Sequence, residues 1–196
     1  MNKPLRPALF LDRDGVVNVD RGYCHRIEHF EWVPGIFDTV RAARELGLAV
    51  VVATNQAGIA RGLFTERDFA RLTKWMLARF AAAKAPLDAV YHCPYHPEGN
   101  SPYNVVSPLR KPAPGMLLLA ARELRLDLAA SAMIGDQESD IEAGKGAGVR
   151  LTALFSDAAT HETRADSRLA DHEATQAWLW VHFGPKPRKG RLRQFD

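Results

Sequence analysis

Seven acidic, basic and hydroxyl side chains occur along this sequence in an order that suits phosphate chemistry. They are Asp12, Asp14, Thr54, Arg110, Lys111, Asp136 and Asp140. Carboxylates are ligands that a hard divalent cation such as Mg²⁺ prefers, and lysine and hydroxyl groups can donate to phosphate oxygens. Together the set predicts a metal-assisted site for a phosphorylated substrate.

Hydrolysis of a phosphate ester needs a nucleophile, a proton donor for the leaving alcohol and neutralisation of the phosphoryl charge. A carboxylate such as Asp12 can attack phosphorus and form an acyl phosphate. A second carboxyl two residues later, Asp14, can protonate the leaving oxygen and later accept a proton from water. Lys111 and Mg²⁺ would neutralise the anions, and Thr54 would donate a hydrogen bond to phosphate.

Short apolar runs alternate with helical patterns, and this alternation predicts an α/β fold with a parallel sheet. We expect strands at residues 8–11, 48–53, 89–91, 131–135 and 150–155. We expect helices at residues 37–46, from a Thr65 cap to about residue 83, at 114–124 and at 139–147. Asp12, Thr54 and Asp136 directly follow predicted strands, where ligands of parallel sheets bind, and Arg110 and Lys111 come just before a helix that Pro114 opens.

The composition indicates an ordinary globular protein. Its 196 residues, 46% hydrophobic and 25% charged, suit one domain with one core. The longest apolar run, residues 48–53, is too short to span a membrane, and the first residues lack a signal-peptide pattern. Cys24 and Cys93 cannot form a disulfide framework. We therefore expect a cytoplasmic protein without a membrane partner.

The positive charge lies mainly at the end of the chain. Five basic residues against one acid fall in residues 184–196, whereas residues 1–183 hold 21 basic and 22 acidic side chains. We therefore divide the chain into a domain at residues 1–183 and a basic, disordered tail at 184–196. The tail is weak support for binding of nucleic acid, which we do not expect.

Four segments resemble the ordered motifs of the haloacid dehalogenase (HAD) superfamily of aspartate-nucleophile phosphatases. They are FLDRDGVVN, VVATNQAGIARG, RKPAPGM and MIGDQESDIEAG. The longer stretches FLDRDGVVNVDRGY, TNQAGIARGLFTE, CPYHPEG and RKPAPGMLL are similar to the D-glycero-D-manno-heptose 1,7-bisphosphate phosphatases and their histidinol-phosphatase relatives. The similarity extends from about residue 8 to residue 155.

The resemblance implies a single doubly wound parallel sheet of strand order 5-4-1-2-3, with helices on both faces. It makes Asp12 the nucleophile and Asp14 the acid/base, with Asp12, the backbone carbonyl of Asp14 and Asp136 as Mg²⁺ ligands. Asp140 would orient this group. The gaps of 42 residues from Asp12 to Thr54 and 57 from Thr54 to Lys111 leave no room for a cap domain.

The resemblance also implies the substrate contacts. Thr54 and Lys111 would hold the transferred phosphate, and Arg110 would recognise the substrate. The remaining substrate-binding residues expected from the matched motifs are Asp20, Arg21, Gly22, Tyr23, Asn55 and Gln56.

Two positions depart from the pattern of the heptose phosphatases. Their structural zinc loop is C-x-H … C-x-C-R-K, but here only Cys93 remains, with Tyr95, Ser107 and Leu109 at the other positions. We therefore predict no structural zinc. Gln137 stands at a position where the heptose phosphatases can carry a lysine that contacts a substrate phosphate. A neutral amide attracts a second, distal phosphate less strongly than a lysine does.

The sequence thus predicts a monomeric, Mg²⁺-dependent phosphatase that removes the C7 phosphate of a heptose 1,7-bisphosphate in heptose or lipopolysaccharide biosynthesis. Alternatives are histidinol phosphate or another small sugar or polyol phosphate as substrate, and a polynucleotide 3′-phosphatase. Outside enzymes, the chain could be a phosphate-binding protein that has lost turnover.

Overall fold

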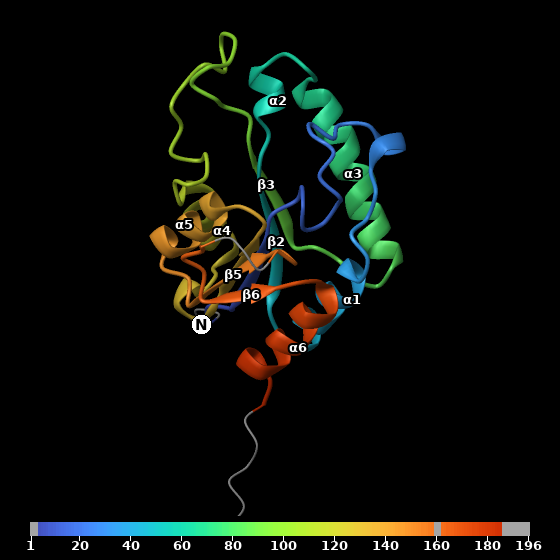
Figure 1. Cartoon of the computed structure of the whole chain (residues 1–196), viewed down its shortest axis with the longest axis vertical. Coiled ribbons are helices and arrows are strands. Elements are labelled where there is room, and N and C mark those ends of the chain that lie inside the picture. The colour runs from blue at the N-terminus through green and yellow to red at the C-terminus, as the bar shows by residue number, and fades with distance from the viewer. Residues whose placement is uncertain (1–3, 159–161, 186–196) are drawn as a thin grey trace, which may run out of the picture.

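The computed structural model describes residues 4–158 and 162–185, and it contains one parallel sheet of six strands (Figure 1). Its strand order is β3-β2-β1-β4-β5-β6. The bounds are Ala8–Leu11 for β1, Ala49–Asn55 for β2, Ala89–Cys93 for β3, Ala132–Gly135 for β4, Leu151–Phe155 for β5 and Ser167–Leu169 for β6. The five predicted strands and their order are confirmed. β6 was not predicted, because three residues with one apolar member carry no periodicity.

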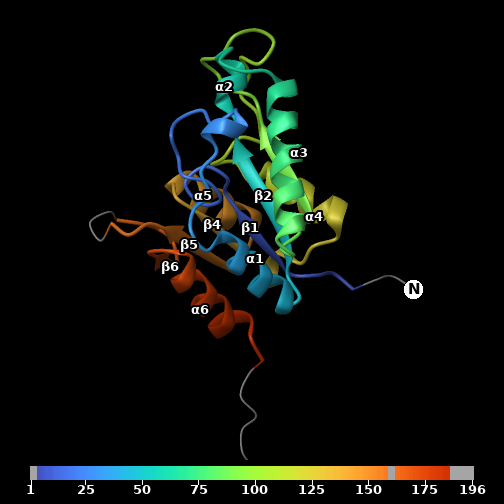
Figure 2. The same ribbon diagram turned by 90° about the vertical axis from the view of Figure 1, so that its right-hand side faces the viewer.

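Helices cover both faces of the sheet, as Figures 1 and 2 show. One face packs against α1 (Ile36–Glu45), α3 (Glu66–Ala82) and α6 (His172–Phe183). The other packs against α4 (Gly115–Leu124) and α5 (Glu138–Ala147). The remaining elements are α2 (Ala57–Ala60), η1 (Ile27–His29) and η2 (Leu128–Ala130). The doubly wound α/β fold is therefore confirmed.

Local signals in the sequence explain where two of the predicted helices begin and end. Thr65 caps α3: its side chain accepts a hydrogen bond from the Asp68 backbone, and the Asp68 carboxylate accepts one in return. Gly47 follows α1 at φ +80°, a left-handed conformation that a side chain would disfavour. Both helices match the prediction within one residue at each end.

The sheet core is apolar on both faces of its central strands. All four residues of β1 are buried, and so are the first six of β2. Leu9 and Leu11 face the α1 and α3 side, whereas Ala8 and Phe10 face the α4 and α5 side. The continuous apolar runs in the sequence follow from this double coverage.

An aromatic cluster fixes the loop that joins β1 to α1. Phe30 and Trp32 of this loop pack against Trp75 and Phe80 of α3, and Phe37 of α1 joins them, with ring centroids 4.7–5.6 Å apart. Aromatic rings bury large areas and pack with defined geometry. The loop after β1, which carries predicted substrate residues, is thus held on the helices beneath it.

The C-terminal part of the chain is only partly described. Trp178 of α6 is buried, as predicted for a final element on the core, whereas Trp180 is 47% exposed. No described helix combines the length and apolar character that a membrane span requires. The predicted basic tail lies, from residue 186 onward, outside the described residues.

Phe80→Ala should destabilise the protein, because Phe80 is fully buried in the aromatic cluster. We expect a loss of about 3–5 kcal/mol in the free energy of unfolding, measured by urea denaturation. Leu118→Ala, at a helical position that is 46% exposed, is the control and should cost about 0.5 kcal/mol or less. Equal losses in the two variants would show that burial of Phe80 in the cluster does not stabilise the fold.

Candidate active site

The Lys111 ammonium connects three parts of the fold at the carboxyl end of the sheet. Its Nζ donates to Asp12 Oδ1 at 2.7 Å and to the carbonyl oxygen of Ala53 in β2 at 2.8 Å. It also lies 2.5 Å from Asp140 Oδ1 in α5. The side chain is 2% exposed, so its charge needs these partners. The structure thus brings together residues that are far apart in the sequence.

Asp12, Asp136 and Asp140 form a carboxylate cluster in which one oxygen from each lies within 4.8 Å of the others. Burial raises the pKa of Asp12 to about 8; Asp140 and Asp14 add to the rise, and Lys111 opposes it. Burial also raises the pKa of Asp136 to about 6. Burial alone would lower the pKa of Lys111, but Asp12 and Asp140 outweigh it and raise this pKa. Three carboxyl groups share this site with a single ammonium, and a divalent cation such as Mg²⁺ would offset the burial and mutual repulsion that raise the pKa values of Asp12 and Asp136, so the set fits such a cation.

Two glycines allow the acidic side chains to approach the backbone closely. A Cβ at Gly135 would lie 2.2 Å from the Cβ of Asp140. A Cβ at Gly15, which has φ +86°, would lie 2.3 Å from Asp136 Oδ2. Glycine is required at both positions, because any side chain would displace a carboxylate of the cluster.

Asp14 lies beside the cluster and is held by donors from three residues. Its carboxylate accepts from Arg13, from Asn18 Nδ2 at 3.0 Å and from Gln56 Nε2 at 3.0 Å. Gln56 Nε2 also donates a hydrogen bond to Thr54 Oγ1 at 2.9 Å. Gln56 therefore links the predicted acid/base to the predicted phosphate-binding hydroxyl.

Asn55 positions Lys111 through the backbone. Its Nδ2 donates to the Lys111 carbonyl and its Oδ1 accepts from the Lys111 amide, both at 3.0 Å. Both polar groups of the Asn55 side chain are engaged in this way. Sequence reasoning grouped Asn55 with the substrate-binding residues, and the structure shows in addition that it fixes the segment carrying Lys111.

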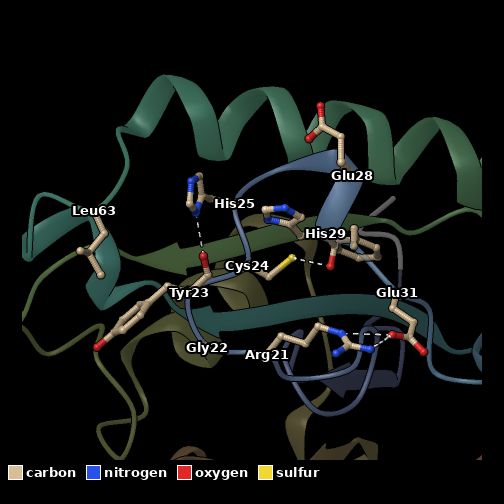
Figure 3. Close-up of a pocket in the computed structure, with 10 residues that line it drawn as sticks. Arg21, Gly22, Tyr23, Cys24, His25, Glu28, His29, Glu31 and Leu63 are labelled. Carbon is tan, nitrogen blue, oxygen red and sulfur yellow. Dashed lines mark hydrogen bonds and ion pairs between the residues drawn. The ribbon is translucent and has the colours of Figure 1, made fainter.

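The loop that carries Asp20, Arg21, Gly22 and Tyr23 has its own turn. Asp20 Oδ1 accepts a hydrogen bond from the Gly22 amide at 2.8 Å, and Gly22 and Tyr23 have φ of +71° and +51°. Arg21 pairs with Glu31, both being largely exposed. Figure 3 shows Arg21 and Tyr23 pointing in opposite directions, beside a cavity of about 680 Å³ lined by residues 21–25, residues 28–31 and Leu63.

Cationic side chains gather near Tyr23. The Arg61 guanidinium lies 5.8 Å from the centroid of the Tyr23 ring. Arg110 is half-buried, its Nη1 has no hydrogen-bond partner, and its pKa is lowered by burial and by Arg61. Burial, Arg110 and Arg61 also lower the pKa of His96. Within residues 4–158 and 162–185, neither arginine has an ion pair with an acidic side chain. Sequence reasoning identified Arg110 but missed Arg61, which lies within the matched TNQAGIARG segment.

The loop that could have held zinc is organised by other contacts. Cys93 is buried, with Sγ 3.9 Å from the carbonyl oxygen of Tyr95. His92 Nε2 lies 2.8 Å from Glu66 Oε2, and its ring stacks on Phe69. His96 Nδ1 accepts from the Glu98 amide. The lack of a structural zinc stays a prediction.

Comparison with known proteins agrees with this arrangement. Residues 108–176 match the HAD-hydrolase-like family. The chain is 54% identical over 151 residues to the D-glycero-alpha-D-manno-heptose-1,7-bisphosphate 7-phosphatase of Burkholderia mallei, which covers 76% of this chain and 80% of that protein. It is 49% identical over 149 residues to the D-glycero-beta-D-manno-heptose-1,7-bisphosphate 7-phosphatase of Escherichia coli K12. This match covers 76% of this chain and 78% of that protein. Together with these relatives, the parallel sheet with an acidic cluster and a buried lysine at its carboxyl end identifies the chain as a HAD-like hydrolase.

Solved structures give the same result. The D,D-heptose 1,7-bisphosphate phosphatase of B. bronchiseptica, solved with magnesium and phosphate, superposes with a TM-score of 0.77 at 28% identity and covers 89% of this chain and 98% of that one. The chain belongs to the heptose-bisphosphate phosphatase family of HAD-like phosphatases. The expected family is thereby confirmed.

Lys111→Met should destabilise the metal-free protein, because it leaves Asp12 and Asp140 buried without their counter-cation. We expect a loss of about 3–5 kcal/mol in the free energy of unfolding, measured by urea denaturation with a chelator present. Adding Asp12→Asn to Lys111→Met should recover part of the loss, since one of the two uncompensated carboxylates is removed. Additive effects of the two substitutions would contradict a direct ion pair.

Proposed function

We propose that this protein is a Mg²⁺-dependent phosphatase that removes the C7 phosphate of D-glycero-D-manno-heptose 1,7-bisphosphate through an aspartyl phosphate on Asp12. The observation that carries the proposal is the contact of Lys111 Nζ with Asp12 Oδ1 within the carboxylate cluster. Relatives named for this activity at 49–54% identity support the substrate. We keep residues 1–183 as the catalytic domain of a cytoplasmic monomer that binds neither membrane nor nucleic acid.

The reaction needs two steps at one carboxylate. Asp12 Oδ2 attacks the phosphorus atom, the bond to the sugar oxygen breaks, and Asp14 gives its proton to that oxygen. Asp14 then takes a proton from water, whose oxygen attacks the phosphorus of the aspartyl phosphate. Inorganic phosphate leaves and the Asp12 carboxylate is restored.

The other groups hold the phosphate during both steps. Lys111 holds Asp12 through Oδ1 and presents its positive charge to the phosphoryl oxygens. Thr54 contributes a buried hydroxyl beside Gln56. Asp12, Asp136 and the backbone carbonyl of Asp14 would hold Mg²⁺, with Asp140 orienting the group. The cation would neutralise charge on the transferring phosphoryl group.

The second phosphate of the substrate requires positive charge away from Asp12. Arg110 and Arg61 supply two guanidinium groups without acidic partners among the described residues, and Arg110 Nη1 has no hydrogen-bond partner. A guanidinium matches the geometry of phosphate oxygens. These groups would compensate for Gln137, whose amide donates to Asp136 Oδ2 at 3.1 Å.

The neutral side chain of Gln137 also favours a second candidate, a phosphatase of small monophosphates such as histidinol phosphate. A monophosphate has no distal anion, so it would not need a lysine at this position. The distinction depends on whether Arg110 contributes to binding.

The first test is phosphate release in the presence of Mg²⁺ from a panel of esters. It contains both anomers of the heptose bisphosphate, histidinol phosphate, simple sugar phosphates and a 3′-phosphorylated oligonucleotide. We expect the highest kcat/KM for one heptose anomer, with loss of activity in Asp12→Asn and on addition of a chelator. Preference for another ester would reject the heptose substrate, and release that persists in Asp12→Asn would reject the mechanism.

Arg110→Gln should weaken binding of the distal phosphate. We expect kcat/KM for the bisphosphate to fall about tenfold to 100-fold, as for a lost hydrogen bond to a charged group, with little change for a sugar monophosphate. Arg61→Gln should act in the same direction. The control is Arg71→Gln on α3, whose side chain is 65% exposed beside Asp68. This substitution should leave kcat/KM unchanged for both the bisphosphate and the monophosphate. Equal losses on the two substrates would mean that Arg110 does not read the second phosphate.

A further inference from the structure

Arg13 lies between the two aspartates of the Asp-x-Asp-Gly motif, yet the reaction above assigns it no part. Its side chain is only 1% exposed and is the largest among the fully buried ones. A buried guanidinium is costly unless its charge is paired and its donors are satisfied. The position of Arg13 therefore requires an explanation from its contacts.

The contacts of Arg13 converge on Asp14. Nη2 donates to Asp14 Oδ1 at 2.9 Å and to Oδ2 at 2.8 Å, and Nε lies 3.3 Å from Oδ1. The same Nη2 donates to the backbone carbonyl of Cys24 at 2.7 Å. The guanidinium also lies 5.7 Å from the centroid of the Phe69 ring, which packs against it from α3. One buried group thus joins Asp14 to the loop that lines the cavity.

The remaining contacts of Asp14 come from neutral amides. Asn18 and Gln56 each donate one hydrogen bond at 3.0 Å. Hydrogen bonds from neutral amide groups are weaker than hydrogen bonds from a charged guanidinium, and each of these two amides contacts only one oxygen of Asp14. Without Arg13, Asp14 would retain only one neutral hydrogen bond on each oxygen, from Asn18 on Oδ1 and from Gln56 on Oδ2, and these hold the carboxylate less firmly than a charged donor does. Because the buried guanidinium is the one charged donor that contacts both oxygens in the described structure, it is the strongest restraint on the direction in which the carboxyl group can transfer a proton.

We propose that Arg13 is a positioning residue for proton transfer by Asp14. It orients the carboxyl group beside Gln56 and Thr54 and ties that orientation to the Cys24 backbone of the loop at residues 20–31. This inference rests on the proposed function, in which Asp14 protonates the leaving oxygen. Because the Arg13 side chain is only 1% exposed, it would act through Asp14 and not by contact with the substrate.

The test uses two esters whose leaving groups differ in their need for a proton. The leaving group of an alkyl phosphate ester, such as the heptose bisphosphate, departs as an unstable alkoxide unless an acid protonates it. The leaving group of p-nitrophenyl phosphate is p-nitrophenolate, a stable anion that departs without a proton. The quantity compared is kcat/KM, which covers only the steps up to formation of the aspartyl phosphate. The later role of Asp14 towards water therefore does not enter the comparison.

In Arg13→Met, we expect kcat/KM for the alkyl ester to fall about 100-fold, within the usual range for lost general acid catalysis. The value for p-nitrophenyl phosphate should fall less than about fivefold. Arg13→Lys, which keeps the charge but not the fork, should show an intermediate and equally selective loss. Asp14→Asn should show the same selectivity, and Arg13→Met combined with Asp14→Asn should lose little more on the alkyl ester than Asp14→Asn alone.

Urea denaturation of each variant separates this role from a purely structural one. If Arg13 only supports the fold, stability falls and both esters lose kcat/KM equally, and the proposal is overturned. Unchanged kinetics on both esters would also overturn it. If Arg13→Met does not fold, the selectivity of Arg13→Lys decides. Failure of the proposed function is distinct, because wild-type protein would then release no phosphate from either ester, or Asp12→Asn would retain activity.

Discussion

The rest of the site depends on one buried interaction, the ammonium of Lys111 between the carboxylates of Asp12 and Asp140. Burying any one of these charged groups without a partner would cost folding free energy, and their mutual attraction offsets that cost. The Ala53 carbonyl adds a bond from β2, and the ammonium therefore holds the ends of two strands and the start of α5 in a fixed relation. Even so, two carboxylates and the adjacent Asp136 outnumber the single positive charge, which makes the site receptive to a cation.

The parallel sheet is what makes this interaction possible. Adjacent strands β1, β2 and β4 all end at the same edge, so side chains far apart in the chain meet there without a dedicated loop. The lysine arrives on a segment without regular structure, and Asn55 compensates by bonding both the amide and the carbonyl of Lys111. Rigid strands thus supply the acids, and a side chain at a strand end supplies the rigidity that the loop lacks.

The sequence predicted the central strands and the acidic residues because both signals are local. Continuous apolar runs indicate strands covered on both faces, and three of these runs are followed directly by a candidate site residue, namely Asp12, Thr54 or Asp136. The contacts of Arg13 could not be predicted, because a charged side chain next to two acids is expected to be solvated, and only the fold reveals that Cys24 and Phe69 enclose it. For the same reason the proximity of Arg61 to Tyr23 escaped prediction, since their meeting depends on how two loops pack.

In the proposed function, substrate choice and chemistry are therefore assigned to different parts of the molecule. Asp12 and Asp136 follow strands, and Lys111 is held in place by Asn55, whereas the groups available to the distal part of a substrate lie on loops. Arg13 is the structural link between the two, because its Nη2 bonds both Asp14 and the Cys24 carbonyl. A displacement of the loop would lengthen one of these hydrogen bonds and change the orientation of the Asp14 carboxyl group. In a fold without a cap, such a bond is a direct way for loop position to influence proton transfer.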